Sequence, residues 1–214
     1  MTDDRASVGH AADRPVRAIL GVVLAGGQSR RMGREKGLIV LGAKPLIQHA
    51  VDRLAPQVDG IIVNVNGDPA RFGEIDVPVV PDTQPDYPGP LAGLLAAMRW
   101  AEKHAANVSH VATVPVDTPF FPTDLVARLR HALDRAPKAD LAFAVTSEGP
   151  QPVFVLAALG LADPLERDMA SGGARRVGEW LRSQRHVEVR FENGAAFFNA
   201  NTPADLAHAE DILK

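Results

Sequence analysis

The sequence predicts an α/β protein: a single-domain, three-layer sandwich with a mostly parallel sheet. Two observations lead to this fold. Short apolar runs rich in branched residues alternate with segments of helical periodicity, a pattern typical of βαβ units and of a sheet covered on both faces. The first apolar run ends in two adjacent glycines, and ligands bind at the carboxyl ends of strands in open α/β sheets.

The composition fits one globular domain. The chain has 214 residues, of which 46% are hydrophobic and 23% charged. We expect a flexible N-terminal tail at 1–16, which is polar and lacks the apolar run of a secretion signal, and one domain at 17–214. A net charge of −3 argues against nucleic-acid binding, and no stretch is apolar enough for a membrane helix. The absence of cysteine excludes disulfides and thiolate chemistry, and it fits the cytoplasm.

The first half of the chain predicts four strands and two helices. In 45–54 the apolar residues recur at helical spacing, and Pro45 suits a first helical turn because its missing N–H is not needed there. The same spacing follows Pro90. In chain order we expect a strand at 18–24, a helix at 45–54, strands at 61–65 and 77–80, a helix at 90–104 and a strand at 108–116.

The second half predicts three further strands and three helices. Asp124 stands just before an amphipathic segment, where an acid favours the helix dipole. We expect helices at 125–133, 174–181 and 203–213, and strands at 141–145, 153–156 and 187–191. No internal repeat or linker divides the chain, which supports one domain.

The loop after the first strand is the most informative segment. Gly26 and Gly27 carry no side chain that would keep a phosphate away, and their backbone N–H groups can bind phosphate oxygens. Positive charges for a triphosphate follow at Arg30, Arg31 and Lys36. The loop is neither the dinucleotide fingerprint nor the P-loop, since it has neither glycine spacing. A plain strand-to-helix turn is the alternative, and the gathering of glycines and cations argues against it.

Asp117 is the candidate metal ligand. It follows the strand at 108–116, and Mg²⁺ prefers one or two carboxylates together with phosphate oxygens and water. The alternative is an aspartate that satisfies the turn before Pro119.

Asp82, after the short third strand, is a candidate for base selection. One carboxylate can accept both the N1–H and the 2-amino group of guanine, a donor pair that adenine lacks, so Asp82 could select GTP. A solvated turn residue is the alternative.

A long signature gives the family resemblance. Residues 24–36 follow L-A-G-G-x-S-x-R-M-G-x-x-K, and GL at 37–38 and LGAKPL at 41–46 complete the pattern. This signature resembles the opening of nucleotidyltransferases, most closely that of the molybdenum cofactor guanylyltransferase family. GPLAG at 89–93 and FFNANTP at 197–203 match further elements of that family, so the resemblance covers about 17–213.

The resemblance implies a fold of the nucleotide-diphospho-sugar transferase type, in which one half of the mostly parallel sheet is a Rossmann-like nucleotide-binding unit. It implies transfer of GMP from GTP to the phosphate of molybdopterin, with release of pyrophosphate. Mg²⁺ would be the cofactor, GTP and molybdopterin the substrates, and proteins that deliver the pterin or mature molybdoenzymes would be transient partners.

The resemblance also assigns site residues. The catalytic residues it implies are Lys36, Asp117 and Arg31, with Asp117 as the metal ligand. The GTP-binding residues are Leu24, Ala25, Gly26, Gly27, Lys36, Asn64, Asp82, Gly89, Gly93 and Asp117. The acceptor-binding residues are Asn199, Asn201 and Arg176.

Structural alternatives remain for several of these residues. Asn64 can satisfy local backbone groups at a strand end, and Asn201 or Thr202 can cap the last helix. Arg176 can lie on a solvated helix face. The chain also departs from the family at Gln151, which precedes Pro152 where the family commonly has His-Pro, and this affects the acceptor pocket.

Other functions remain open at this stage. A cytidylyltransferase of the same pathway is disfavoured because such enzymes usually show L-A-A-G in the first loop and lack G-P-L-A-G. A sugar-1-phosphate nucleotidyltransferase shares the glycine loop and the lysine. A non-catalytic GTP-binding chaperone or sensor subunit is a third class, and it would not need both Lys36 and Asp117.

Overall fold

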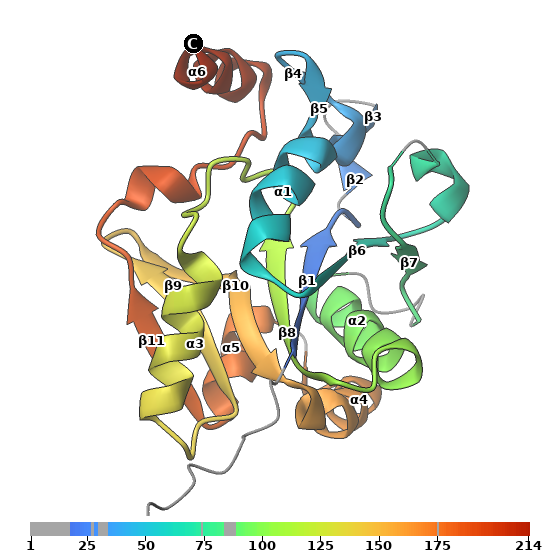
Figure 1. The fold of residues 1–214 in the computed structure, drawn as a ribbon, viewed down its shortest axis with the longest axis vertical. Helices are drawn as coiled ribbons and strands as arrows, with labels where there is room; N and C mark the ends of the chain where they lie inside the picture. The colour runs from blue at the N-terminus through green and yellow to red at the C-terminus, as the bar shows by residue number, and fades with distance from the viewer. Residues whose placement is uncertain (1–17, 27, 30–33, 74, 84–88, 175) are drawn as a thin grey trace, which may run out of the picture.

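The computed structural model describes residues 18–26, 28–29, 34–73, 75–83, 89–174 and 176–214. Their centre is a seven-stranded sheet of order β11-β9-β10-β8-β1-β6-β7 (Figure 1). The strands are β1 Ala18–Leu24, β6 Gly60–Val65, β7 Val79–Pro81, β8 Val108–Pro115, β9 Leu141–Thr146, β10 Gly149–Ala158 and β11 His186–Arg190. All neighbours pair in parallel except β10, which is antiparallel to β8 and β9. The predicted mostly parallel sheet is confirmed.

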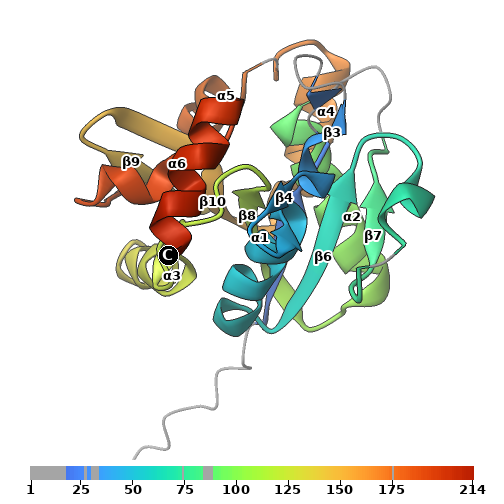
Figure 2. The same cartoon turned by 90° about the horizontal axis from the view of Figure 1, so that it is seen from above.

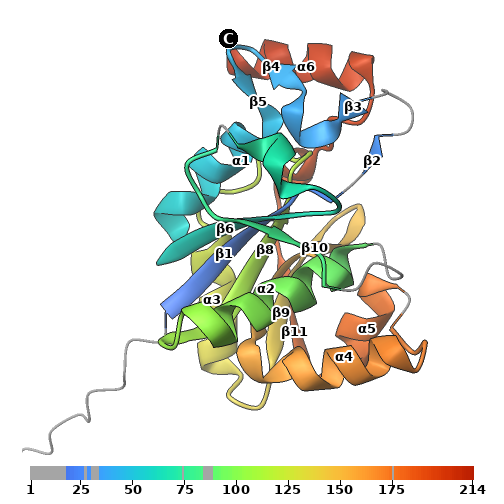
Figure 3. The same cartoon turned by 90° about the vertical axis from the view of Figure 1, so that its right-hand side faces the viewer.

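Helices cover both faces of this sheet (Figure 3). They are α1 Leu46–Leu54, α2 Pro90–His104, α3 Leu125–Arg135, α4 Ala162–Ala170, α5 Val177–Ser183 and α6 Pro203–Leu213. The strand residues alternate between two cores: Val23 packs with α1 and α3, whereas Val22 packs with α2, α4 and α5. The structure is therefore the expected three-layer sandwich.

Two parts of the second half differ from the sequence prediction. Helix α4 was not predicted, although Ala162, Leu165 and Met169 are buried at helical spacing. The helix expected at 174–181 begins only at Val177, because the chain first turns at Gly172, whose φ is +76°. α4 buries its apolar residues in the same core as α2 and α5.

Small elements near the first strand hold the residues that follow the glycine loop. Lys36 begins the 3₁₀ turn η1, Lys36–Leu38, and the hairpin of β4 Val40–Leu41 and β5 Lys44–Pro45 follows. α6 packs against β4, so the C-terminal helix lies beside this N-terminal hairpin (Figures 2 and 3). Segments that are far apart in sequence therefore meet above the carboxyl end of the sheet.

The tail expected at 1–16 lies outside the described residues, and the domain boundary remains a prediction. Within the described ranges, no helix has the length and apolar character needed to span a bilayer.

Candidate active site

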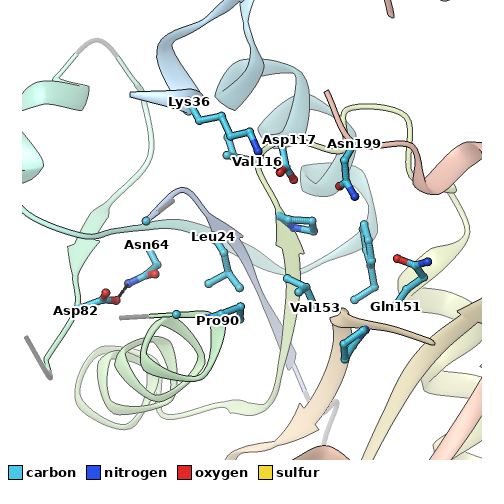
Figure 4. Close-up of a pocket in the computed structure, with 15 residues that line it drawn as sticks. Leu24, Lys36, Asn64, Asp82, Pro90, Val116, Asp117, Gln151, Val153 and Asn199 are labelled. Carbon is cyan, nitrogen blue, oxygen red and sulfur yellow. Dashed lines mark hydrogen bonds and ion pairs between the residues drawn. The ribbon is translucent and has the colours of Figure 1, made fainter. Parts of the chain in front are cut away.

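A cavity of about 340 Å³ opens where β1 and β8 end (Figure 4). It is lined by Leu24, Gly26, Lys36, Asn64, Asp82, Gly89, Pro90, Pro115, Val116, Asp117, Gln151, Pro152, Val153, Phe154 and Asn199. These residues come from both halves of the chain. Because β1 and β8 are adjacent parallel strands, the start of the glycine loop and Asp117 both lie at the carboxyl-terminal edge of the sheet.

An ion pair lies in the middle of the cavity wall. The Lys36 ammonium donates to the Asp117 carboxylate, with 2.5 Å between Nζ and Oδ2, and the two side chains are only 16% and 19% exposed. Lys36 also donates to the Asn201 side-chain oxygen. A partly buried pair is screened less than a surface pair, so these charges act strongly on a ligand beside them.

The segment that precedes α6 is tied to the strand end that carries Asp117. The Ala200 N–H donates to the Asp117 carbonyl at 2.8 Å. The hydroxyl of Thr118, which is fully buried, donates to the Asn199 side-chain oxygen at 2.6 Å. These bonds place Asn199 in the cavity lining and Asn201 beside Lys36.

A second polar pair, Asn64 and Asp82, lies at one end of the cavity. The Asn64 amide donates to the Asp82 carboxylate at 2.9 Å and to the Val80 carbonyl at 3.2 Å (Figure 4). Asn64 is 2% exposed, so its orientation is fixed by burial as well as by these bonds. Burial raises the pKa of the Asp82 carboxyl, and the bond from Asn64 acts in the opposite direction. Asn64 is thus placed to orient the carboxylate that we expect to read the base.

Gly93 makes the position of Asn64 possible. A Cβ at this position of α2 would lie 2.6 Å from Leu24 Cδ2 and 3.0 Å from Asn64 Cγ, too close for either side chain. Gly89, just before α2, has a φ of +142°, a backbone conformation that side chains rarely adopt. Gly93 therefore lets α2 approach the ends of β1 and β6, and Gly89 permits the turn before α2. Gly93 does not line the cavity, so its contribution is the room it leaves for Leu24 and Asn64.

The remaining wall is formed by the start of β10, residues 151–154. The pairing of β10 with β9 shifts register between Gln151 and Val155, so the strand bends here. Phe154 packs edge-on against Phe197, with 4.9 Å between ring centroids. The result is a mostly apolar wall that ends in the Gln151 amide, at the opposite end of the cavity from the Asn64–Asp82 pair (Figure 4).

A family model described as the MobA-like NTP transferase domain matches residues 21–188, which span both polar pairs and the β10 wall. The chain belongs to this family. It is therefore a nucleotidyltransferase, and the non-catalytic alternative is not supported.

Individual relatives agree with the family assignment. A molybdenum cofactor guanylyltransferase of Burkholderia cenocepacia is 46% identical over 200 residues, which cover 89% of this chain and 94% of that protein. Molybdopterin-guanine dinucleotide biosynthesis protein A of Archaeoglobus fulgidus superposes with a TM-score of 0.72 at 25% identity, over 91% of this chain and 98% of that one. A Mycobacterium tuberculosis protein, solved in complex with manganese, shares the fold with a TM-score of 0.65 at 20% identity, over 91% and 98%.

Most site residues that the sequence assigned in this MobA-like domain meet at the cavity. Ala25 does not line the cavity: it is buried, and its N–H donates to the Asn64 carbonyl at 2.8 Å. Arg176 does not line the cavity: it is exposed at the start of α5 and pairs with Glu179 at 2.9 Å. Gly27 and Arg31 lie outside the described residues.

Sequence reasoning did not assign Pro90, Val116, Val153 or Phe154 to the site. Their apolar side chains look like ordinary strand and helix residues in the sequence. Assigning Val153 and Phe154 to the site requires the strand order, in which β10 lies beside β8.

Proposed function

We propose that this protein transfers GMP from GTP to the phosphate of molybdopterin and releases pyrophosphate. The observation that carries the proposal is one cavity with three parts: the Asn64–Asp82 pair at one end, the Lys36–Asp117 pair in the middle and the β10 wall at the other end. These parts suit a guanine base, a triphosphate and a second substrate, in that order. The guanylyltransferase name of the 46% identical relative supports the same reaction.

Asp82 is our candidate for the guanine-reading residue. Its carboxylate can accept both guanine donors, and Asn64 holds it in place while leaving part of its acceptor capacity open. Cytosine and adenine have no such adjacent N–H pair, so the pocket favours GTP over CTP and ATP.

The triphosphate would lie between the glycine loop and the ion pair. We propose that the backbone at Gly26, at the carboxyl end of β1, faces the phosphates, while Lys36 offsets the charge of the α-phosphate and the departing pyrophosphate. Gly27 and Arg31 are proposed for the same task from the sequence signature. Leu24, Gly89 and Pro90 complete the nucleotide end of the cavity.

The donor set fits magnesium. Among the described residues, no group of three or more His, Cys, Asp or Glu could hold a metal ion by itself. Asp117 instead offers one carboxylate beside the proposed phosphate position, which suits an ion that takes most ligands from phosphate and water. When bound, Mg²⁺ would supply positive charge to the phosphate oxygens.

The acceptor is proposed to bind against the β10 wall. Asn199 and Gln151 carry amides that can donate to and accept from a pterin edge, and Val153 and Phe154 offer apolar contact to its ring. This arrangement gives Gln151 a role in place of the histidine common in the family. Arg176 would need another arrangement of α5 to take part.

The reaction requires mainly positioning. A phosphate oxygen of molybdopterin attacks the α-phosphorus of GTP, a new P–O bond forms, and the bond to the β-phosphate bridging oxygen breaks in line with it. The nucleophile is already ionised at neutral pH, so the protein needs no general base. Lys36 offsets the negative charge that develops on the transferring phosphate, and the cavity walls hold both substrates in the orientation that in-line attack requires.

Asp82→Asn tests the guanine assignment. Asparagine replaces an acceptor oxygen by a donor, so the preference in kcat/KM for GTP over CTP should fall about 10- to 100-fold. Steady-state pyrophosphate release with each nucleotide measures this preference, and Asp76→Asn, an exposed position outside the cavity, is the matched control. An unchanged preference would remove Asp82 from base recognition.

The pH dependence of the KM for GTP is a second test of Asp82. The proposed binding form of Asp82 is ionised, and burial raises its pKa, so acidification protonates it before an ordinary aspartate. The KM for GTP of the wild type should therefore rise as the pH falls towards this raised pKa. Asp82→Asn should lack that component.

The cytidylyltransferase and sugar-phosphate alternatives are not favoured by the guanylyltransferase relatives. We further propose that the enzyme works in the cytoplasm, where GTP is made. Transient contacts with proteins that deliver or receive the pterin are part of this proposal.

A further inference from the structure

The start of α6 contains a capping box that reaches beyond the helix. Thr202 is the N-cap, and its hydroxyl accepts from the Asp205 N–H at 3.2 Å. In return, the Asp205 carboxylate accepts from the Thr202 N–H at 2.8 Å. This reciprocal pair is all that capping requires.

The same Asp205 oxygen accepts a second bond, from the Asn201 N–H at 2.9 Å. This bond lies outside the helix. The Asn201 side chain in turn accepts from the Lys36 ammonium. One carboxylate at the surface is therefore separated by a single residue from the cation of the Lys36–Asp117 pair.

The segment between α6 and the site has little freedom at its other end. Ala200 is fully buried and its N–H is bonded to the Asp117 carbonyl, and Asn199 accepts from Thr118. Residues 199–201 thus run from the strand end of β8 to Asp205. The Asn201 N–H is shared between the Asp205 carboxylate and the Asn199 carbonyl at 3.1 Å. A change at Asp205 therefore acts first on Asn201, because Asn199 and Ala200 are bonded to the strand end.

We propose that Asp205 is a positioning residue for the reaction: it fixes the backbone at Asn201 so that the Asn201 amide holds the Lys36 ammonium against Asp117. The inference rests on the proposed roles of Lys36 and Asp117. Asp205 touches neither substrate nor metal in this account, and it acts through Asn201. The competing explanation is that Asp205 stabilises only the helix.

Two alanine variants separate these explanations. Thr202→Ala removes the hydroxyl of the capping box but keeps both backbone bonds to the Asp205 carboxylate, whereas Asp205→Ala removes those bonds. We expect kcat to fall about 10-fold in Asp205→Ala and to stay within about twofold in Thr202→Ala. Asp205→Asn, which keeps an acceptor oxygen, should recover most of kcat. Both alanine variants should fold, because Ala209 is the only residue of α6 that is buried.

A double-mutant cycle with Asn201→Ala tests the route. If Asp205 acts through the Asn201 side chain, Asp205→Ala should lower kcat by less than about twofold in the Asn201→Ala background. Turnover is measured as GTP- and molybdopterin-dependent pyrophosphate release below the melting temperature of each variant. KM for GTP should change less than kcat.

Three results would overturn the inference: an unchanged kcat in Asp205→Ala, an equal loss in Thr202→Ala, or losses that multiply in the double mutant. Activity retained by Lys36 or Asp117 variants would instead contradict the proposed function. The two failures are therefore distinguishable.

Discussion

Asp117→Asn is expected to lower kcat about 1,000-fold and leave the fold intact. The substitution keeps the shape of a side chain that is 19% exposed but removes its negative charge, which is paired with Lys36 at 2.5 Å. It also removes the proposed carboxylate ligand of Mg²⁺. Acceptor-dependent pyrophosphate release measures the loss, and a thermal melt checks the fold.

Asp124→Asn is the matched control for this variant. Asp124 lies at the start of α3, its side chain is 61% exposed, and it does not line the cavity. It should keep the wild-type rate. Near-normal turnover in Asp117→Asn would remove Asp117 from the mechanism.

Lys36→Met should lower kcat/KM for GTP about 100- to 1,000-fold. Methionine keeps the apolar length of the side chain but removes the ammonium that we expect to offset charge on the transferring phosphate. The change also leaves the Asp117 carboxylate without its cationic partner. Single-turnover kinetics with saturating GTP separate the chemical step from nucleotide binding.

Lys44→Met provides the comparison for Lys36→Met. Lys44 belongs to the adjacent hairpin, is 55% exposed and pairs with Asp52 at the surface, where an ion pair contributes little. A comparable loss in both lysine variants would point to hairpin stability rather than phosphate chemistry.

Periodicity predicted most of the fold, because strand and helix patterns depend on neighbouring residues. The antiparallel direction of β10 was not predicted, although the segment 146–152 between the expected strands is too short for a parallel crossover. The connection is a turn at 147–148 that ends in Gly149, with a φ of +126°. The bend after Gln151, which forms the third wall of the cavity, includes Pro152, whose missing N–H interrupts the ladder, but the pairing of the bent strand is not visible in the sequence.

The individual residues of the site could be recognised in the sequence, but their pairing could not. Lys36, Asp117, Asn64 and Asp82 are polar residues in loops or at strand ends, and such residues stand out in a sequence. Their pairing does not: the Asn64–Asp82 bond spans 18 positions and the Lys36–Asp117 bond spans 81. The family resemblance assigned Arg176 to the acceptor, whereas the structure pairs it with Glu179 on α5.

Asn201 and Thr202, which precede the last helix, have different roles in the structure. The sequence left open whether Asn201 or Thr202 caps the last helix, and the structure shows Thr202 as the cap. Asn201 is free for Lys36 because Thr202 takes that role. The T-x-x-D spacing of Thr202 and Asp205 is that of a capping box, but no pattern in the sequence indicates the further bond from the Asn201 N–H to Asp205.

The most direct test of the account is pyrophosphate release by the purified protein with Mg²⁺ and either GTP, CTP or ATP, each with and without molybdopterin. We expect release that needs both GTP and molybdopterin and yields the guanine dinucleotide form of the pterin. Release that prefers CTP, or that is driven by a sugar 1-phosphate in place of molybdopterin, would contradict it.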